Sequence, residues 1–128
     1  MAKKKRYFSE MSKLQWRWVM LLVQSLMNKE ELPRQEAMKK AWLTFKLLEA
    51  LGKGIVEFSY KKQDGTTRQA RGTLHRGVSE SFDNYKRKGG KSPRDNSNTD
   101  GIYVYWDLDK NGFRSFHAQD LIQLNNNN

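Results

Sequence analysis

The sequence contains no cysteine, only two prolines and no long hydrophobic run. Without cysteine the chain cannot form a disulfide framework, a thiolate zinc site or a cysteine nucleophile. The apolar stretch near the N-terminus, residues 18–23, is six residues long, whereas a bilayer-spanning helix needs about 20. Charged residues separate it from the preceding basic cluster, and no small-residue cleavage site follows it. We therefore expect a soluble, cytoplasmic protein without a membrane partner.

Acidic residues are also scarce relative to basic ones. The 128 residues include 24 Lys and Arg against 14 Asp and Glu, which gives a net charge of +10. The surplus is uneven, with +7 over residues 1–53, +4 over residues 54–100 and −1 over residues 101–128. A chain of this length holds one domain, or a small domain with a helical appendage. Its charge favours a polyanionic partner such as nucleic acid.

Two amphipathic helices are predicted in the N-terminal part. Apolar residues recur at spacings of three and four over residues 11–26, and Ser9 is a suitable N-cap. A second periodic segment has Pro33 in its first turn and Gly52 as its C-cap. The connection between the segments is short, which favours an antiparallel helix pair over residues 8–52.

At residue 54 the apolar period changes from 3.6 to 2, which is typical of a half-buried strand. The side chains expected on its buried face are Val56, Phe58 and Tyr60. A hairpin turn is predicted at Asp64-Gly65, with a return strand over residues 67–74. Gly72 in the middle of that strand predicts a bulge or a close backbone approach.

Periodicity fades over residues 76–100, where we expect a long flexible loop that is either functional or simply disordered. Beyond it, residues 102–117 read as two strands joined by a turn at 109–112. A single helical turn at 118–120 and a short closing strand at 121–124 follow.

The predicted order is therefore α-α-β-β-loop-β-β-turn-β. Five short strands with tight turns, a long middle loop and a helical turn before the last strand are typical of an SH3-like or Sm-like barrel. We predict an α+β fold, in which an antiparallel helix pair precedes a five-stranded SH3-like (Sm-like) β-barrel over residues 53–124. A basic disordered arm at 1–7 and a disordered tail at 125–128 are expected to flank it.

Motifs for catalysis or metal binding are weak. Residues 107–112 match the first half of a calcium loop, but Ala118 occupies the position that needs a bidentate glutamate. A hairpin turn explains this segment better. His75 and His117 have no neighbouring carboxylate cluster, and no catalytic triad spacing or glycine-rich phosphate loop is present. We expect a protein that is not an enzyme and that has no metal and no cofactor.

Basic and aromatic residues on a small barrel favour binding of a nucleic-acid strand, because bases stack on aromatic rings while Lys and Arg follow the phosphates. Tyr103 and Tyr105 are the candidates for stacking, although most aromatic residues of so small a barrel form its core. The candidate basic contacts lie on the N-terminal arm, the middle loop and three strand positions: Lys3, Lys4, Lys5, Arg6, Lys86, Arg87, Lys88, Lys91, Arg94, Arg68, Arg71 and Arg114.

The last hairpin also carries a family resemblance. Its segments are Tyr105-Trp106-Asp107-Leu108, Phe113-Arg114-Ser115-Phe116 and Asp120-Leu121-Ile122. They resemble the C-terminal signature of small WYL-like, SH3-type β-barrel proteins of Bacteroidetes and their phages and mobile elements. Residues 54–60 with 64–74 resemble the first hairpin of that family, and residues 36–42 resemble the helix that precedes it.

The resemblance implies an Sm-like barrel that senses a ligand or binds nucleic acid, with Arg114 contributing to the ligand surface. A winged-helix domain is not recognisable in these residues, so independent transcription regulation is not expected. The leading hypothesis is a non-enzymatic nucleic-acid-binding module for single or double strands with weak sequence specificity. Two alternatives are a protein-interaction adaptor with a protein partner, and a barrel that senses a small nucleotide-like ligand at Arg114.

Overall fold

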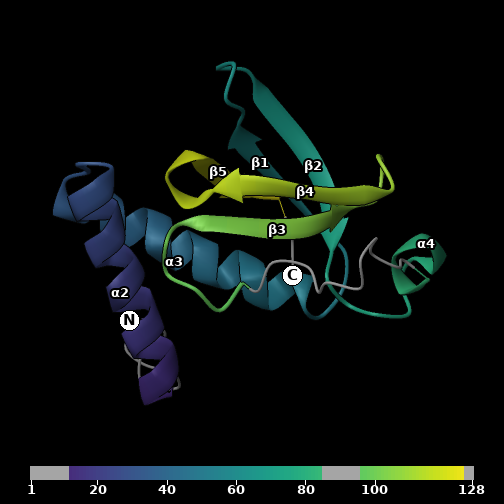
Figure 1. Cartoon of the computed structure of the whole chain (residues 1–128), viewed down its shortest axis with the longest axis horizontal. Coiled ribbons are helices and arrows are strands. Elements are labelled where there is room, and N and C mark those ends of the chain that lie inside the picture. The colour runs from purple at the N-terminus through teal and green to yellow at the C-terminus, as the bar shows by residue number, and fades with distance from the viewer. Residues whose placement is uncertain (1–11, 85–95, 126–128) are drawn as a thin grey trace, which may run out of the picture.

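The structure of the chain is a computed structural model that describes residues 12–84 and 96–125. Two helices precede a five-stranded antiparallel sheet, which confirms the predicted α+β order (Figure 1). The helices are α2 (Lys13–Lys29), α3 (Arg34–Leu51) and the short α4 (Glu80–Asp83). The strands and the 3-10 turn are β1 (Val56–Lys61), β2 (Thr67–Thr73), β3 (Ile102–Asp107), β4 (Gly112–His117), η2 (Ala118–Asp120) and β5 (Leu121–Leu124). No helix of the described residues has the length and apolarity required to cross a membrane.

Helix α2 begins with a capping box. The Ser12 hydroxyl accepts a hydrogen bond from the Gln15 backbone N–H at 3.1 Å, and the Gln15 side chain accepts one from the Ser12 N–H at 3.0 Å. Two backbone donors that a helix end leaves free are thus satisfied reciprocally. The prediction of Ser9 as the N-cap is wrong, because the serine that has a glutamine three residues later caps this helix.

Helix α3 begins one residue later than predicted, since Pro33 is its N-cap rather than part of its first turn. Gly52 is the C-cap, as predicted, and its N–H donates to the Leu48 carbonyl at 3.2 Å. The two helices pack on each other and form a V that opens away from their short connection (Figure 1). The predicted helix pair is therefore present, with its helices crossing at an angle.

The strands are ordered β4-β3-β2-β1-β5, and every neighbouring pair is antiparallel. Both predicted hairpins are present, with Gly65 and Asn111 at positive φ in their turns. Strand β2 pairs with β3 only at Gly72 and Thr73. The sheet does not close into a continuous barrel, and β4 and β5 are its two edge strands.

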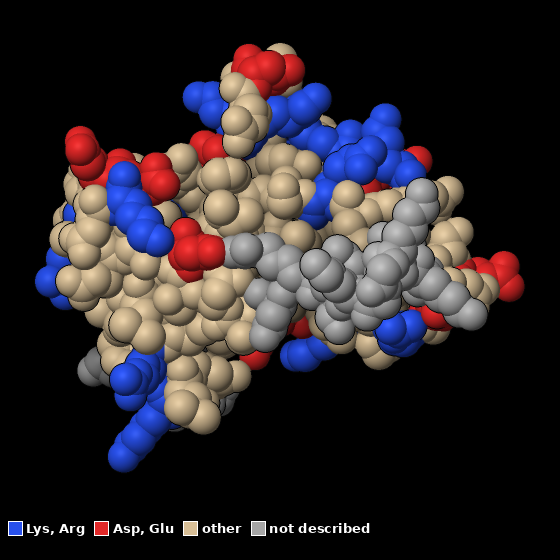
Figure 2. Space-filling view, viewed as in Figure 1, with Lys and Arg blue, Asp and Glu red and all other residues tan. Residues whose placement is uncertain are grey.

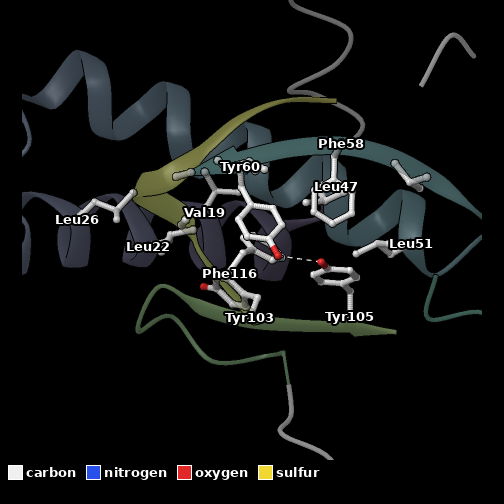
Figure 3. Packing of buried hydrophobic residues seen from close by; sticks show 14 of the residues in the cluster. Val19, Leu22, Leu26, Leu47, Leu51, Phe58, Tyr60, Tyr103, Tyr105 and Phe116 are labelled. Atoms are coloured by element: carbon white, nitrogen blue, oxygen red, sulfur yellow. Dashed lines mark hydrogen bonds between the residues drawn. The ribbon is translucent and has the colours of Figure 1, made fainter. Parts of the chain in front are cut away.

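The hydrophobic core lies between the helix pair and the inner face of the sheet (Figure 3). The sheet contributes five aromatic side chains, and the helices contribute mainly leucine and valine. Burial of each such side chain is worth about 1.5–3 kcal/mol, so the helices are part of the same core as the strands. The members labelled in Figure 3 are Phe58, Tyr60, Tyr103, Tyr105, Phe116, Val19, Leu22, Leu26, Leu47 and Leu51.

Gly72 is buried where the backbone of β2 passes over the Tyr105 ring. A Cβ atom at this position would lie 2.4 Å from Tyr105 Cδ2 and 2.9 Å from the Trp106 carbonyl oxygen. The predicted close backbone approach is confirmed, because only glycine fits against these atoms.

The prediction of a flexible loop over residues 76–100 is wrong at both ends of that range. Residues 80–83 form α4, whose Phe82 is 8% exposed and packs 5.4 Å from the Trp106 ring. At the other end, the Asn96 side chain accepts from the Val104 N–H at 2.9 Å and donates to the Val104 carbonyl at 2.8 Å. The Phe82 ring and the Asn96 amide therefore hold these two segments in place, although neither segment has apolar periodicity.

Candidate functional site

A groove of about 400 Å³ opens between the end of β1, the turn after it, β4 and η2. We call it the mouth groove. It brings together the ends of strands that are not neighbours in the sheet, because β1 and β4 are separated there by β2 and β3. Its lining residues are Tyr60, Lys61, Lys62, Gln63, Asp64, Arg114, Ser115, Phe116, His117 and Asp120.

Arg114 lies on the concave side of the sheet at the rim of this groove. It pairs with Tyr105 across β3 and β4, and cross-strand partners share a face. The side chain is exposed, and its Nη1 donates to the Phe113 carbonyl at 3.1 Å. Within residues 12–84 and 96–125 no carboxylate forms an ion pair with it. Its charge therefore remains available to an anion in the groove.

Lys61 and Lys62 carry two further positive charges into the mouth groove from the end of β1. Both are exposed, and neither forms an ion pair with any described residue. Asp64 also lies there, but its Oδ1 accepts from the Thr66 hydroxyl at 2.6 Å and from the Thr66 N–H at 2.9 Å. Those hydrogen bonds hold the pKa of Asp64 below its ordinary value and keep the carboxylate in the turn.

Beside the groove, a polar network is buried in the inner face of the sheet. The Tyr105 hydroxyl lies 2.9 Å from the Tyr60 hydroxyl and donates to Asp107 Oδ2 at 3.2 Å (Figure 3). The same carboxylate oxygen accepts from Arg68 Nη2 in an ion pair. Asp107 Oδ1 accepts from the backbone N–H groups of Asp109 at 2.9 Å and Lys110 at 3.1 Å. The network thus joins β1, β2, β3 and the β3–β4 turn.

These contacts set the charge of the network. Burial alone would raise the pKa of Asp107, but hydrogen bonds from Arg68 and the Lys110 N–H outweigh it and lower that pKa. Burial opposes the charge of Arg68 as well, yet its bonds to Asp107 and Tyr105 raise its pKa overall. Burial, and then the contact with Tyr60, raises the pKa of the Tyr105 hydroxyl, which stays protonated. The network therefore holds one matched ion pair at neutral pH.

The predicted site residues fall into different environments. Arg114 lines the groove, whereas Arg68 is paired with buried Asp107 and its side chain is only 21% exposed. Arg71 is exposed, with its Nε 3.9 Å from Asp109 Oδ1. The basic residues of the arm and of the middle loop lie outside the described residues: Lys3, Lys4, Lys5, Arg6, Lys86, Arg87, Lys88, Lys91 and Arg94.

The prediction that Tyr103 and Tyr105 stack on bases is wrong. Both side chains are 0% exposed, because they fill the core. The Tyr103 hydroxyl donates to the Asn98 carbonyl, and its ring lies 5.8 Å from that of Trp18. Neither ring has a face free for a base.

Basic side chains nevertheless gather around the groove. In Figure 2 Lys and Arg atoms cluster in the upper part of the view, where the β1–β2 hairpin and β4 lie in Figure 1. The basic residues of these elements and of the adjacent β3–β4 turn are Lys61, Lys62, Arg68, Arg71, Lys110 and Arg114. The cluster is a surface feature suited to a polyanion.

Among the residues that line the groove, Arg114 was predicted as a binding residue, whereas the polar residues Lys61, Lys62, Gln63 and His117 were not. Gln63 Nε2 lies 3.4 Å from His117 Nε2, which makes a bridge between the β1–β2 turn and β4. The signal in the sequence was the polar triplet at 61–63 directly before the predicted Asp64-Gly65 turn. Its proximity to β4 depends on the curvature of the sheet, which strand periodicity does not specify.

A second groove, of about 350 Å³, lies between α2 and α3 and is mainly apolar. Leu14 at its rim is 79% exposed. We call this second groove the helix groove. Its lining residues are Leu14, Gln15, Trp18, Phe45, Leu48, Glu49 and Asn96.

Comparison with known proteins gives one match. A family model described as WYL_2, Sm-like SH3 beta-barrel fold, matches residues 44–122. The match begins within α3 and runs into β5, so it includes every element that lines the mouth groove. No curated protein and no solved structure gives a significant match. The chain belongs to the WYL_2 family, whose fold is an Sm-like SH3 β-barrel.

Proposed function

We propose that this chain is a non-enzymatic module that binds nucleic acid through phosphate contacts at the mouth groove. The observation that carries the proposal is the convergence of Lys61, Lys62 and Arg114 on one groove, none of them in an ion pair with a described residue. The net charge of +10 supports it, since a polyanion is attracted to the whole molecule before it reaches the groove.

Phosphate contacts, rather than base stacking, are expected to dominate the affinity. The two tyrosines proposed for stacking are buried, whereas cations around a groove interact with the backbone of any strand. Each neutralised phosphate contributes about −0.7 for a single strand, or −0.9 for a duplex, to the slope of log K against log salt. Three groove cations therefore account for about −2 of that slope with a single strand, and basic residues elsewhere add to it.

Fluorescence anisotropy at low salt, with labelled single- and double-stranded DNA and RNA, tests this proposal. Arg114→Gln removes one groove charge, and Lys39→Gln removes one from an exposed position on α3 outside the groove. We expect Arg114→Gln to weaken binding several-fold and to reduce the salt slope by about 0.7–0.9, with a much smaller effect of Lys39→Gln. Equal effects of the two substitutions would reject the groove as the site. Absence of binding in the micromolar range would reject the function.

The helix groove favours a second candidate function, a protein-interaction adaptor. A leucine that is 79% exposed beside an apolar groove gains about 1.5–3 kcal/mol when a partner buries it. Such binding is apolar and therefore insensitive to salt and nuclease. A partner that remains bound to the wild-type chain in high salt after nuclease treatment, and that is lost with Leu14→Asp, would support it. A partner equally retained by Leu14→Asp would contradict it.

A further inference from the structure

The mouth groove contains an amide positioned between its cationic side and its β4 wall. Gln63 follows Lys61 and Lys62 directly, and its Nε2 meets His117 Nε2 at 3.4 Å. Within residues 12–84 and 96–125, this is the one hydrogen bond of the Gln63 side chain. A glutamine amide has two N–H donors and a carbonyl with two lone pairs. One N–H and the carbonyl therefore remain for a ligand.

The pair of groups that remains is complementary to the N6/N7 edge of adenine. A glutamine amide can form two hydrogen bonds with adenine: its N–H donates to N7, and its carbonyl accepts from the N6 amino group. In a single strand the base edges are accessible, whereas in a duplex they are reached only through the grooves. The volume of about 400 Å³ lies near the lower end of the range for small-ligand sites, about 300–1,000 Å³. The volume of the groove is therefore compatible with one nucleotide of a single strand.

His117 fixes which atoms of Gln63 face the ligand. When His117 Nε2 accepts from Gln63, one amide N–H is committed and the rest of the amide keeps a defined orientation. His117 is a positioning residue in this arrangement.

We propose that Gln63 reads the N6/N7 edge of adenine in single-stranded nucleic acid bound at the mouth groove, while Lys61, Lys62 and Arg114 hold the phosphates. The proposal rests on the nucleic-acid-binding function proposed above and assigns the base preference of that same site. The discrimination expected from one bidentate pair is about tenfold.

Two labelled single-stranded DNA decamers, one of deoxyadenosine and one of 7-deaza-deoxyadenosine, test the proposal by anisotropy. The two strands have equal charge and similar stacking, and they differ at the N7 acceptor. The wild-type chain should bind the adenine strand about tenfold more tightly. Gln63→Met keeps the length of the side chain and should remove the difference, whereas Gln24→Met, at an exposed position on α2, should preserve it. His117→Leu should reduce the difference without changing the salt slope.

The outcomes separate this inference from the function on which it rests. If Arg114→Gln weakens binding but the two decamers bind wild type equally, base reading by Gln63 is refuted and phosphate binding stands. A tenfold preference that persists in Gln63→Met also refutes the role of Gln63. If neither decamer binds wild type at low salt, both the base preference and the nucleic-acid function are refuted.

Discussion

Replacement of Gly72 by alanine is expected to destabilise the protein by about 2–3 kcal/mol. The added Cβ would lie 2.4 Å from Tyr105 Cδ2, whereas carbon atoms pack at about 3.5–4.0 Å. The ring must therefore move by roughly 1 Å. It cannot move freely, because it is fully buried and its hydroxyl contacts Tyr60 and Asp107.

The expected loss in the free energy of unfolding of Gly72→Ala combines three effects. Overpacking of a buried site costs about 1–3 kcal/mol, and weakening of the Tyr105 hydrogen bonds costs about 1 kcal/mol more. The lower entropy of the unfolded chain with alanine offsets about 0.4–1 kcal/mol. For a domain of this size the net loss corresponds to a fall of about 8–12 °C in Tm. The loss of stability is measured by urea denaturation and by thermal unfolding, both followed by circular dichroism.

Gly54→Ala is the matched control for this prediction. A Cβ at Gly54 meets no atom within 4 Å, and its φ lies outside the left-handed region. We expect its stability to stay within about 0.5 kcal/mol of wild type. A Gly72→Ala protein as stable as wild type, or an equal loss in both variants, would show that the approach of β2 to Tyr105 is not tight.

Other predictions concern the polar network and the first helix cap. Asp107→Asn leaves the Arg68 guanidinium without its carboxylate, and the expected loss in the free energy of unfolding is about 3 kcal/mol. Because the pKa of Asp107 is lower in the folded state than its ordinary 3.8, its contribution is present above about pH 4. It is lost as the pH falls through the folded-state pKa, so urea titrations from pH 7 to pH 2 should show a smaller acid loss in Asp107→Asn. Ser12→Ala removes the capping box and should cost about 1 kcal/mol in thermal unfolding, with no change in nucleic-acid affinity.

Local patterns were sufficient to predict most of the fold. The alternation in β1, the Asp64-Gly65 turn and Gly52 at the end of α3 each depend on residues that are close in sequence, and each is present in the structure. The same reasoning placed the first cap three residues too early, because it did not weigh the glutamine that completes the capping box at Ser12. It also missed α4, a single turn whose stability depends on a distant contact between Phe82 and Trp106.

The site was less predictable, because its residues meet only after folding. Gln63 and His117 are 54 positions apart, and Arg68 and Asp107 are 39 apart. Aromatic composition favoured base stacking by Tyr105, but the residues on both sides of it in β3, Val104 and Trp106, are half-buried and buried, so both faces of this strand are covered. Distinguishing a stacking aromatic from a core aromatic requires knowing which face the helices cover, and the sequence pattern alone does not contain that information.

The two arginines of the inner face show how one residue type acquires opposite roles. Arg68 and Arg114 lie on strands β2 and β4 and share the concave side of the sheet. Arg68 faces buried Asp107, whose carboxylate would be costly without a cation, so its charge is used within the fold. Arg114 forms no ion pair with a described carboxylate. Ser115→Asp, which adds a carboxylate to the groove lining next to Arg114, should therefore weaken anion binding at the mouth groove in the anisotropy assay.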